Sequence, residues 1–146
     1  MAGDLRLANE AWEALFRAQA TIAREFEDAD IWGDLLPREY GVLYALSTAP
    51  DGLRITDLMN DVLLTQAGVS RLVARLERRE LIAREDDPDD RRACRLKLTE
   101  DGVAVQRRVG AAHARHVARA MTRALDQTQL KTLRDLTTAL LEGSPT

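Results

Sequence analysis

Asp90-Arg91-Arg92-Ala93-Cys94-Arg95-Leu96-Lys97-Leu98-Thr99-Glu100-Asp101-Gly102 is the stretch that decides the fold of this chain. Within it, Cys94, Leu96 and Leu98 alternate with Arg95 and Lys97, and this period of two predicts a strand with one covered face. Residues 81–85 predict the partner strand of a hairpin, with residues 86–92 at its tip. Thr99 predicts the N-cap of a further helix, in which Glu100 and Asp101 complement the positive end of the helix dipole.

An amphipathic helix is predicted directly upstream, over residues 64–81, with Thr65 as its N-cap. Val69, Leu72, Val73 and Leu76 follow the spacing i, i+3, i+4, i+7 and predict one buried stripe. Arginines and polar residues lie on the opposite side. A basic helix followed by an arginine-tipped hairpin fits double-stranded DNA, because the helix fills a major groove while the tip reaches the neighbouring minor groove.

The formal net charge of −3 is unexpected for a protein that binds negatively charged DNA, but the charges are unevenly distributed along the chain. Five arginines and two glutamates between Thr65 and Arg84 give this segment a net charge of +3, which leaves −6 for the rest of the chain. A basic face on an acidic body restricts nucleic acid to one side of a protein. The alternative is that charged helix faces only keep the protein soluble.

The length and composition of the chain limit the classes of protein to which it can belong. A chain of 146 residues is long enough for one core and short for two independent domains. No run approaches the roughly 18 apolar residues of a membrane helix, and the acidic N-terminus differs from a secretory signal, so we expect a cytoplasmic protein without a membrane partner. One cysteine excludes an internal disulfide framework. We find no nucleophile–base pair and no glycine-rich phosphate loop, so an enzyme is not expected.

The remaining segments predict a mainly helical chain with a small β wing, because Ala, Leu, Arg and Glu are abundant and aromatic residues are few. A first helix is predicted over residues 4–28, and Pro37 predicts the first residue of a second. Residues 53–55 predict a very short strand. Thr56 predicts the N-cap of a brief helix that follows it, and Leu63-Leu64 predict a turn. The helix after Thr99 is expected to reach about residue 125, and Asp126 with Gln129 predicts the capping box of the last helix.

The order of these elements, together with two local patterns, resembles the multiple-antibiotic-resistance regulator (MarR) family. Its wing pattern of Asp-x-Arg, a strand and Leu-Thr-x-x-Gly is present as Asp90-Arg91-Arg92 and Leu98-Thr99-Glu100-Asp101-Gly102. Asp87-Pro88-Asp89 and the segment from Leu64 to Val73 are also similar to family sequence. The resemblance spans residues 5–141.

This resemblance implies a winged helix-turn-helix fold in a single subunit, residues 1–146. Residues 31–100 would form the DNA-binding lobe, and residues 4–30 and 101–142 the helices that build a homodimer. The implied role is a transcription factor, most often a repressor that a small ligand releases from a palindromic operator. The rival hypothesis is a helical protein–protein adaptor that has kept the fold and lost DNA binding.

Four residues at the exposed start of the arginine-rich helix are predicted to contact bases: Thr65, Gln66, Ser70 and Arg71. Glutamine pairs with adenine and arginine with guanine through two hydrogen bonds each. Arg75, one turn beyond Arg71, is better placed to contact phosphate, which positions a protein without reading sequence. The alternative is that these are solvated helix residues. Arg78 and Arg79 are weaker candidates for a DNA contact, because the alternative for this part of the helix is that Glu77 and Glu80 simply pair with nearby arginines.

Arg92 is the predicted finger of the wing, because a guanidinium fits a narrow, negatively charged A·T minor groove. Asp90 is expected to orient Arg92 by a charge-assisted hydrogen bond. The alternative is an ordinary exposed salt bridge in a turn. Composition does not distinguish Arg91 from Arg92, and the choice of Arg92 is implied by the family spacing.

Neither a metal nor a cofactor is predicted. The acidic run at residues 85–90 lacks the glycine and distal glutamate of a calcium loop, and we interpret it as a solubilising edge of the wing. His113 and His116 are spaced i, i+3, but no third ligand is identifiable. Cys94 is interpreted as a small packed residue on the inward side of its strand.

The family resemblance also implies a small aromatic or phenolic effector bound where the dimer helices meet the DNA-binding lobe. Trp12, Phe16, Tyr40 and Tyr44 are the predicted walls of that pocket, with Trp32 as a further candidate. The alternative is that each of these aromatic side chains belongs to the core.

Overall fold

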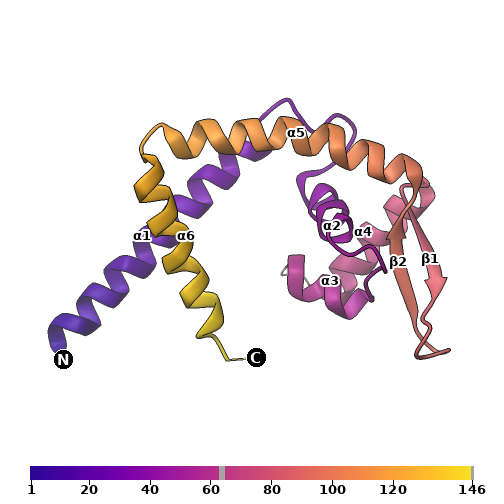
Figure 1. Ribbon diagram of the computed structural model, residues 1–146, viewed down its shortest axis with the longest axis horizontal. Coiled ribbons are helices and arrows are strands. Elements are labelled where there is room, and N and C mark those ends of the chain that lie inside the picture. The colour runs from indigo at the N-terminus through magenta and orange to yellow at the C-terminus, as the bar shows by residue number, and fades with distance from the viewer. Residues whose placement is uncertain (63–64, 146) are drawn as a thin grey trace. The chain divides into compact units, whose positions relative to one another are not determined.

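The computed structural model describes residues 1–62 and 65–145 and shows a mainly helical chain with one small antiparallel sheet (Figure 1). The expected turn at Leu63-Leu64 lies outside the described residues. The elements in chain order are α1 (Ala2–Glu27), α2 (Pro37–Ser47), α3 (Ile55–Val62), α4 (Gln66–Arg78), β1 (Ile82–Asp86), β2 (Cys94–Leu98), α5 (Glu100–Thr122) and α6 (Gln127–Glu142). They divide into two compact units, Met1–Phe26 with His113–Thr146 and Glu27–Ala112. Within residues 1–62 and 65–145, no helix combines the length and the apolar character that a membrane crossing requires.

The core of the unit Glu27–Ala112 lies where α2, α3 and α4 pack against one another and against the hairpin. The predicted stripe on α4 is confirmed, since its four apolar side chains are all buried. α2 buries its apolar edge against them, beginning at Pro37 as expected. The fully buried apolar side chains of this core are Val42, Leu43, Leu58, Val69, Val73, Leu76 and Leu96.

Several predicted boundaries are wrong, among them that of the arginine-rich helix, which spans Gln66–Arg78 instead of residues 64–81. α3 begins at Ile55, which places Thr56 inside the helix instead of at its cap. The Asp57 carboxylate accepts a hydrogen bond from the Arg54 N–H at 3.0 Å, so the helix start is capped at Arg54, two residues before Thr56. The first strand begins at Ile82 instead of Leu81, and α5 ends at Thr122 instead of near residue 125.

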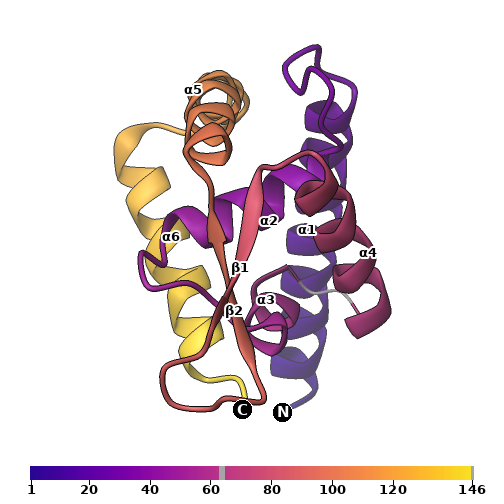
Figure 2. The ribbon, with the colours of Figure 1, turned by 90° about the vertical axis from the view of Figure 1, so that its right-hand side faces the viewer.

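The hairpin is the wing of the fold (Figure 2). β1 and β2 pair antiparallel, with Ile82 opposite Leu98 and Asp86 opposite Cys94. The predicted short strand at residues 53–55 is reduced to one bridge, in which Leu53 and Leu96 exchange two backbone hydrogen bonds of 3.0 and 2.7 Å. This bridge ties the hairpin to the segment that leads into α3.

The Leu-Thr-x-x-Gly pattern joins the end of the wing to α5. The Thr99 hydroxyl oxygen accepts the Gly102 N–H at 3.0 Å and its O–H donates to the Glu80 carbonyl at 2.6 Å, so the predicted N-cap is confirmed. The Thr99 N–H donates to the Leu81 carbonyl at 3.1 Å. A Cβ on residue 102 would overlap that same Leu81 carbonyl oxygen. Only glycine therefore allows the first turn of α5 to approach this closely.

The unit Met1–Phe26 with His113–Thr146 consists of α1, the end of α5 and α6. Phe26 and His113 contact edge to face with ring centroids 5.1 Å apart, and Arg123 pairs with Glu25 at 2.7 Å. The predicted capping box at Asp126 and Gln129 is confirmed at the start of α6. Neither α1 nor α6 contains a buried residue.

Gly102→Ala is predicted to lower the free energy of unfolding by about 1–3 kcal/mol, because the added methyl group forces α5 away from Leu81. Urea denaturation followed by circular dichroism measures this change. Gly3→Ala is the matched control, since a Cβ on Gly3 in α1 meets nothing within 4 Å. Equal stability of the Gly102→Ala variant and the wild type would contradict the steric role.

Candidate nucleic-acid interface

The N-terminus of α4 carries the first group of predicted site residues. Thr65 is in an extended conformation, with φ of −70° and ψ of 159°, and its Oγ1 accepts the Gly68 N–H at 3.2 Å. The predicted N-cap is thus confirmed. Because the apolar stripe faces the core, the other side of α4 is left to polar and cationic side chains.

The predicted base-contacting residues lie within the first two turns of this helix. Thr65, Gln66 and Arg71 are exposed, whereas Ser70 is half-buried. The Arg71 Nε–H donates to the Ala67 carbonyl at 3.3 Å, so the start of its side chain follows the helix surface. The Thr65 hydroxyl oxygen is already engaged as a cap. Gln66 and Arg71 therefore offer the most accessible hydrogen-bonding groups of the four.

Arg75 has a partner that the sequence analysis missed. Its Nη2 lies 3.4 Å from Oε1 of Glu39, a side chain of α2 with an exposed fraction of 0%. Arg79, at the C-cap of α4, approaches the other oxygen of the same carboxylate, Oε2, at 3.7 Å. Arg75 remains 47% exposed, so the predicted phosphate contact and the ion pair are compatible.

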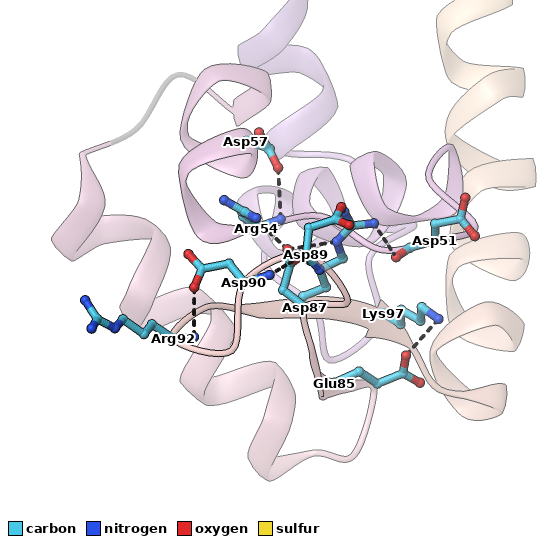
Figure 3. A network of polar contacts seen from close by, with 10 residues as sticks. Asp51, Arg54, Asp57, Glu85, Asp87, Asp89, Asp90, Arg92 and Lys97 are labelled. Atoms are coloured by element: carbon cyan, nitrogen blue, oxygen red, sulfur yellow. Dashed lines mark hydrogen bonds and ion pairs between the residues drawn. The ribbon is translucent and has the colours of Figure 1, made fainter.

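The wing loop is organised around a buried aspartate (Figure 3). Asp87 Oδ2 accepts hydrogen bonds from Arg54 Nε at 2.7 Å and from Arg95 Nε at 3.0 Å. Its Oδ1 accepts the backbone N–H groups of Asp89 and Asp90 at 2.8 and 3.2 Å. The side chain of Asp87 is 0% exposed, so both oxygens have partners inside the protein.

This finding corrects the interpretation of the acidic run as a purely solubilising edge. Asp86, Asp89 and Asp90 are exposed, but Asp87 joins the start of α3, the wing loop and β2. The hydrogen bond from Arg54, followed by that from the Asp89 N–H, holds the pKa of Asp87 well below its ordinary value. The same pairing raises the pKa of Arg54.

Arg92 is exposed, and its side chain extends away from the Asp87 cluster (Figure 3). Asp90 does orient this residue, but through the backbone instead of the guanidinium: its Oδ1 accepts the Arg92 N–H at 2.9 Å. The expected charge-assisted bond to the side chain is therefore wrong. Asp90 shapes the turn, and the turn sets the direction in which Arg92 leaves it.

A second ion pair ties α4 to the wing. Arg84 on β1 donates from Nε to Glu77 Oε1 at 2.9 Å and from Nη1 to Cys94 Sγ at 3.6 Å. Glu77 therefore pairs with Arg84 across the α4–β1 turn. Cys94 is half-buried beside this guanidinium.

The predicted effector residues fall in two groups. Trp12 and Phe16 on α1 are 65% and 58% exposed, with ring centroids 6.3 Å apart. Tyr40 and Tyr44 on α2 form another pair at 6.3 Å, in which Tyr40 is buried and Tyr44 is 54% exposed. Burial raises the pKa of Tyr40. The two pairs belong to different units of the chain, and a pocket shared by all four residues stays a prediction.

A separate hollow of about 280 Å³ lies in the unit Glu27–Ala112, between the end of α2, β2 and the start of α5. It is lined by Leu46, Ser47, Ala49, Pro50, Lys97, Leu98, Val103, Gln106 and Arg107. None of the predicted aromatic residues contributes to it.

Comparison with known proteins gives the same family from sequence and from structure. The model of the MarR family matches residues 34–93, which hold α2, α3, α4 and the wing loop. The transcriptional regulator HosA of Escherichia coli O111:H- is 35% identical over 69 residues, 47% of this chain and 50% of HosA. Sco3205 of Streptomyces coelicolor, a MarR family regulator solved in complex with DNA, superposes with a TM-score of 0.80 and 28% identity, covering 94% of this chain and 88% of Sco3205.

Residues 34–93 of the chain thus match the MarR family model, and the fold of the chain is similar to that of MarR family regulators. PcaV of Streptomyces coelicolor, a transcriptional regulator solved with its natural ligand, matches with a TM-score of 0.65 and 27% identity over 95% of this chain and 92% of PcaV. The chain spans about half the length of the curated relatives it matches.

The wing pattern that this chain shares with the MarR family has a physical explanation in its structure. Asp87 provides the buried hydrogen-bond acceptor of the loop, and Asp90 shapes the turn that carries Arg92. Thr99 caps the start of α5, and Gly102 allows that helix to approach Leu81 closely. Each polar residue satisfies backbone or guanidinium donors that the short hairpin would otherwise leave without partners.

Asp87→Asn is predicted to lower the free energy of unfolding at neutral pH. It should also make that free energy depend less steeply on pH in the acid range. Because folding lowers the pKa of Asp87 below 3.8, its stabilisation is complete above pH 3.8 and declines as the pH falls toward the folded-state value. The wild type should therefore lose stability more steeply than the variant below pH 3.8. Urea denaturation between pH 7 and acid measures both slopes, with Asp89→Asn as the exposed control. Parallel pH profiles for wild type and Asp87→Asn would contradict the buried pairing.

Proposed function

We propose that this chain is a DNA-binding transcription regulator, and that it represses transcription as a homodimer bound to a pseudo-palindromic operator. The observation that carries the proposal is the contrast between held and exposed arginines. Arg71 at the start of α4 and Arg92 at the wing tip are exposed, whereas Arg54 and Arg95 are held by buried Asp87. Two exposed guanidiniums on a fixed helix and a fixed loop suit successive grooves of one duplex.

In this proposal the N-terminal half of α4 enters the major groove. Gln66 and Arg71 contact base edges there, with Thr65 and Ser70 beside them, and Arg75 contacts phosphate. Arg92 enters the adjacent minor groove, where a narrow A·T tract concentrates negative potential. The complex of Sco3205 with DNA, at 28% identity, supports the same partner for this chain.

A homodimer would place two such surfaces about 10 bp apart, one helical turn of DNA. The support comes from α1 and α6, which contain no buried residue in the single chain. Large apolar side chains that are 58–77% exposed gather on these two helices: Leu5, Leu7, Trp12, Phe16, Leu136, Leu140 and Leu141. Apolar surface of this extent is typical of a protein interface.

We also propose that a small aromatic or phenolic effector lowers DNA affinity by favouring a dimer in which the two α4 helices are wrongly spaced. PcaV, with its natural ligand bound, supports ligand response in a relative that covers most of this chain. Exposed Trp12 makes fluorescence a suitable readout. If no compound in a panel of benzoates and phenols changes both fluorescence and DNA affinity, this part of the proposal is wrong.

The DNA-binding proposal predicts that the chain binds the region upstream of its own gene more tightly than random-sequence duplex at every salt concentration. Arg71→Ala should weaken operator binding by about 1–3 kcal/mol and random binding by less, because it removes a base contact. Arg92→Ala should weaken operator binding and relax the preference for A·T flanks. Fluorescence anisotropy with labelled duplexes measures these affinities, and Arg108→Ala on α5 is the matched exposed control. Equal affinity of the wild type for both duplexes would contradict operator recognition.

The homodimer proposal predicts a particle of twice the chain mass of 16.3 kDa in sedimentation equilibrium at micromolar concentration. Leu140→Glu should shift the equilibrium toward the single chain, because it introduces a charge into the proposed apolar interface. Lys131→Glu, an exposed change on the same helix, is the control. A wild-type protein that stays a single chain under these conditions would overturn the proposal.

A further inference from the structure

Glu39 is a fully buried carboxylate in the first turn of α2, with an exposed fraction of 0%. Its Oε1 accepts the Leu36 N–H at 3.2 Å and completes the N-terminal cap of the helix. A neutral glutamine would provide the same acceptor. The cap alone therefore does not explain why a charged group occupies a position where desolvation of the charge is costly.

The charge is compensated from α4. Arg75 Nη2 and Arg79 Nη1 lie 3.4 and 3.7 Å from the two carboxylate oxygens of Glu39. Arg79 also donates from Nη1 to the Asp34 carbonyl at 3.1 Å. The two arginines are spaced i, i+4 and remain 47% and 36% exposed. Each thus has one side against a buried anion and the other toward solvent.

We propose that Glu39 is a positioning residue that sets the ratio of specific to non-specific DNA affinity. Its negative charge lies 3.4 Å from Arg75 and 3.7 Å from Arg79, which biases the orientation of both guanidiniums and offsets part of their charge. The inference rests on the proposed DNA-binding function of α4. A guanidinium that is already oriented loses less conformational freedom when it meets a phosphate in the correct register.

The same carboxylate limits binding to the wrong sequence. Non-specific affinity depends on how many phosphates the cations of a protein neutralise, and it does not require a fixed geometry. Freed from Glu39, Arg75 and Arg79 would follow any phosphate backbone. Glu39 therefore favours the operator register over random duplex, although it adds a negative charge behind the contact surface.

Glu39→Gln tests this role, because it keeps the size of the side chain and the cap acceptor and removes only the charge. Affinity for the upstream operator fragment and for random duplex is measured by anisotropy over a series of KCl concentrations. We expect random-duplex affinity to rise about three- to tenfold and the salt slope to steepen by about 1 per bound subunit. Operator affinity should rise less, so the ratio of operator affinity to random-duplex affinity should fall at least about threefold.

Glu13→Gln, which removes a carboxylate paired with Arg17 on α1, is the control for net charge and should leave the ratio unchanged. In an Arg75→Gln background, Glu39→Gln should have a smaller effect than in the wild type, because one of the two held cations is gone. If Glu39→Gln does not fold, Glu39→Asp withdraws the carboxylate from both arginines at constant charge and should also lower the ratio.

The outcomes separate this inference from the proposed function. A wild type that binds both duplexes equally overturns the DNA-reading proposal and this inference with it. A wild type that discriminates, with a Glu39→Gln variant that melts at a lower temperature and keeps the same ratio, overturns this inference alone and leaves Glu39 as a structural cap.

Discussion

The buried Asp87 carboxylate is the interaction on which the geometry of the wing depends. A two-stranded hairpin is at best marginally stable by itself, and within residues 1–62 and 65–145 one isolated bridge, Leu53 to Leu96, pairs this hairpin with the rest of its unit. Asp87 adds two guanidiniums and two backbone N–H groups from segments up to 33 residues away. The loop that carries Arg92 is thereby fixed to the start of α3 instead of being held only by its own strands.

A second buried carboxylate, Glu39, belongs to the same unit. Asp87 accepts hydrogen bonds from Arg54 and Arg95, whereas Glu39 forms longer ion pairs of 3.4 and 3.7 Å with Arg75 and Arg79. The exposed arginines of α4 and the wing stand beside these held pairs. Together the two carboxylates turn an arginine-rich surface, which would attract any polyanion, into one with a defined arrangement of charge.

Local periodicity was sufficient to predict the buried stripe of α4 and the second strand. Local capping and proline signals predicted the Thr99 and Asp126 caps and the start of α2, because each of these features depends on neighbours within a few residues. The roles of Asp87 and Glu39 depend on partners 33 to 40 residues away, which no local pattern contains. In sequence, Asp87 was one of several acidic residues in a turn. The cap at Thr56 failed for a different, local reason, since Asp57 accepts the N–H of Arg54 three residues earlier and the helix begins at Ile55.

Hydroxyl-radical footprinting of the operator fragment with wild type and Asp87→Asn is the most direct test of the fixed wing. At saturating protein, the variant should keep protection around the major-groove contacts proposed for α4 and lose it in the proposed flanking minor grooves, because its wing is no longer held in place. Asp89→Asn should keep the full footprint. Unchanged flanking protection in a folded Asp87→Asn protein would contradict the central role of the buried aspartate.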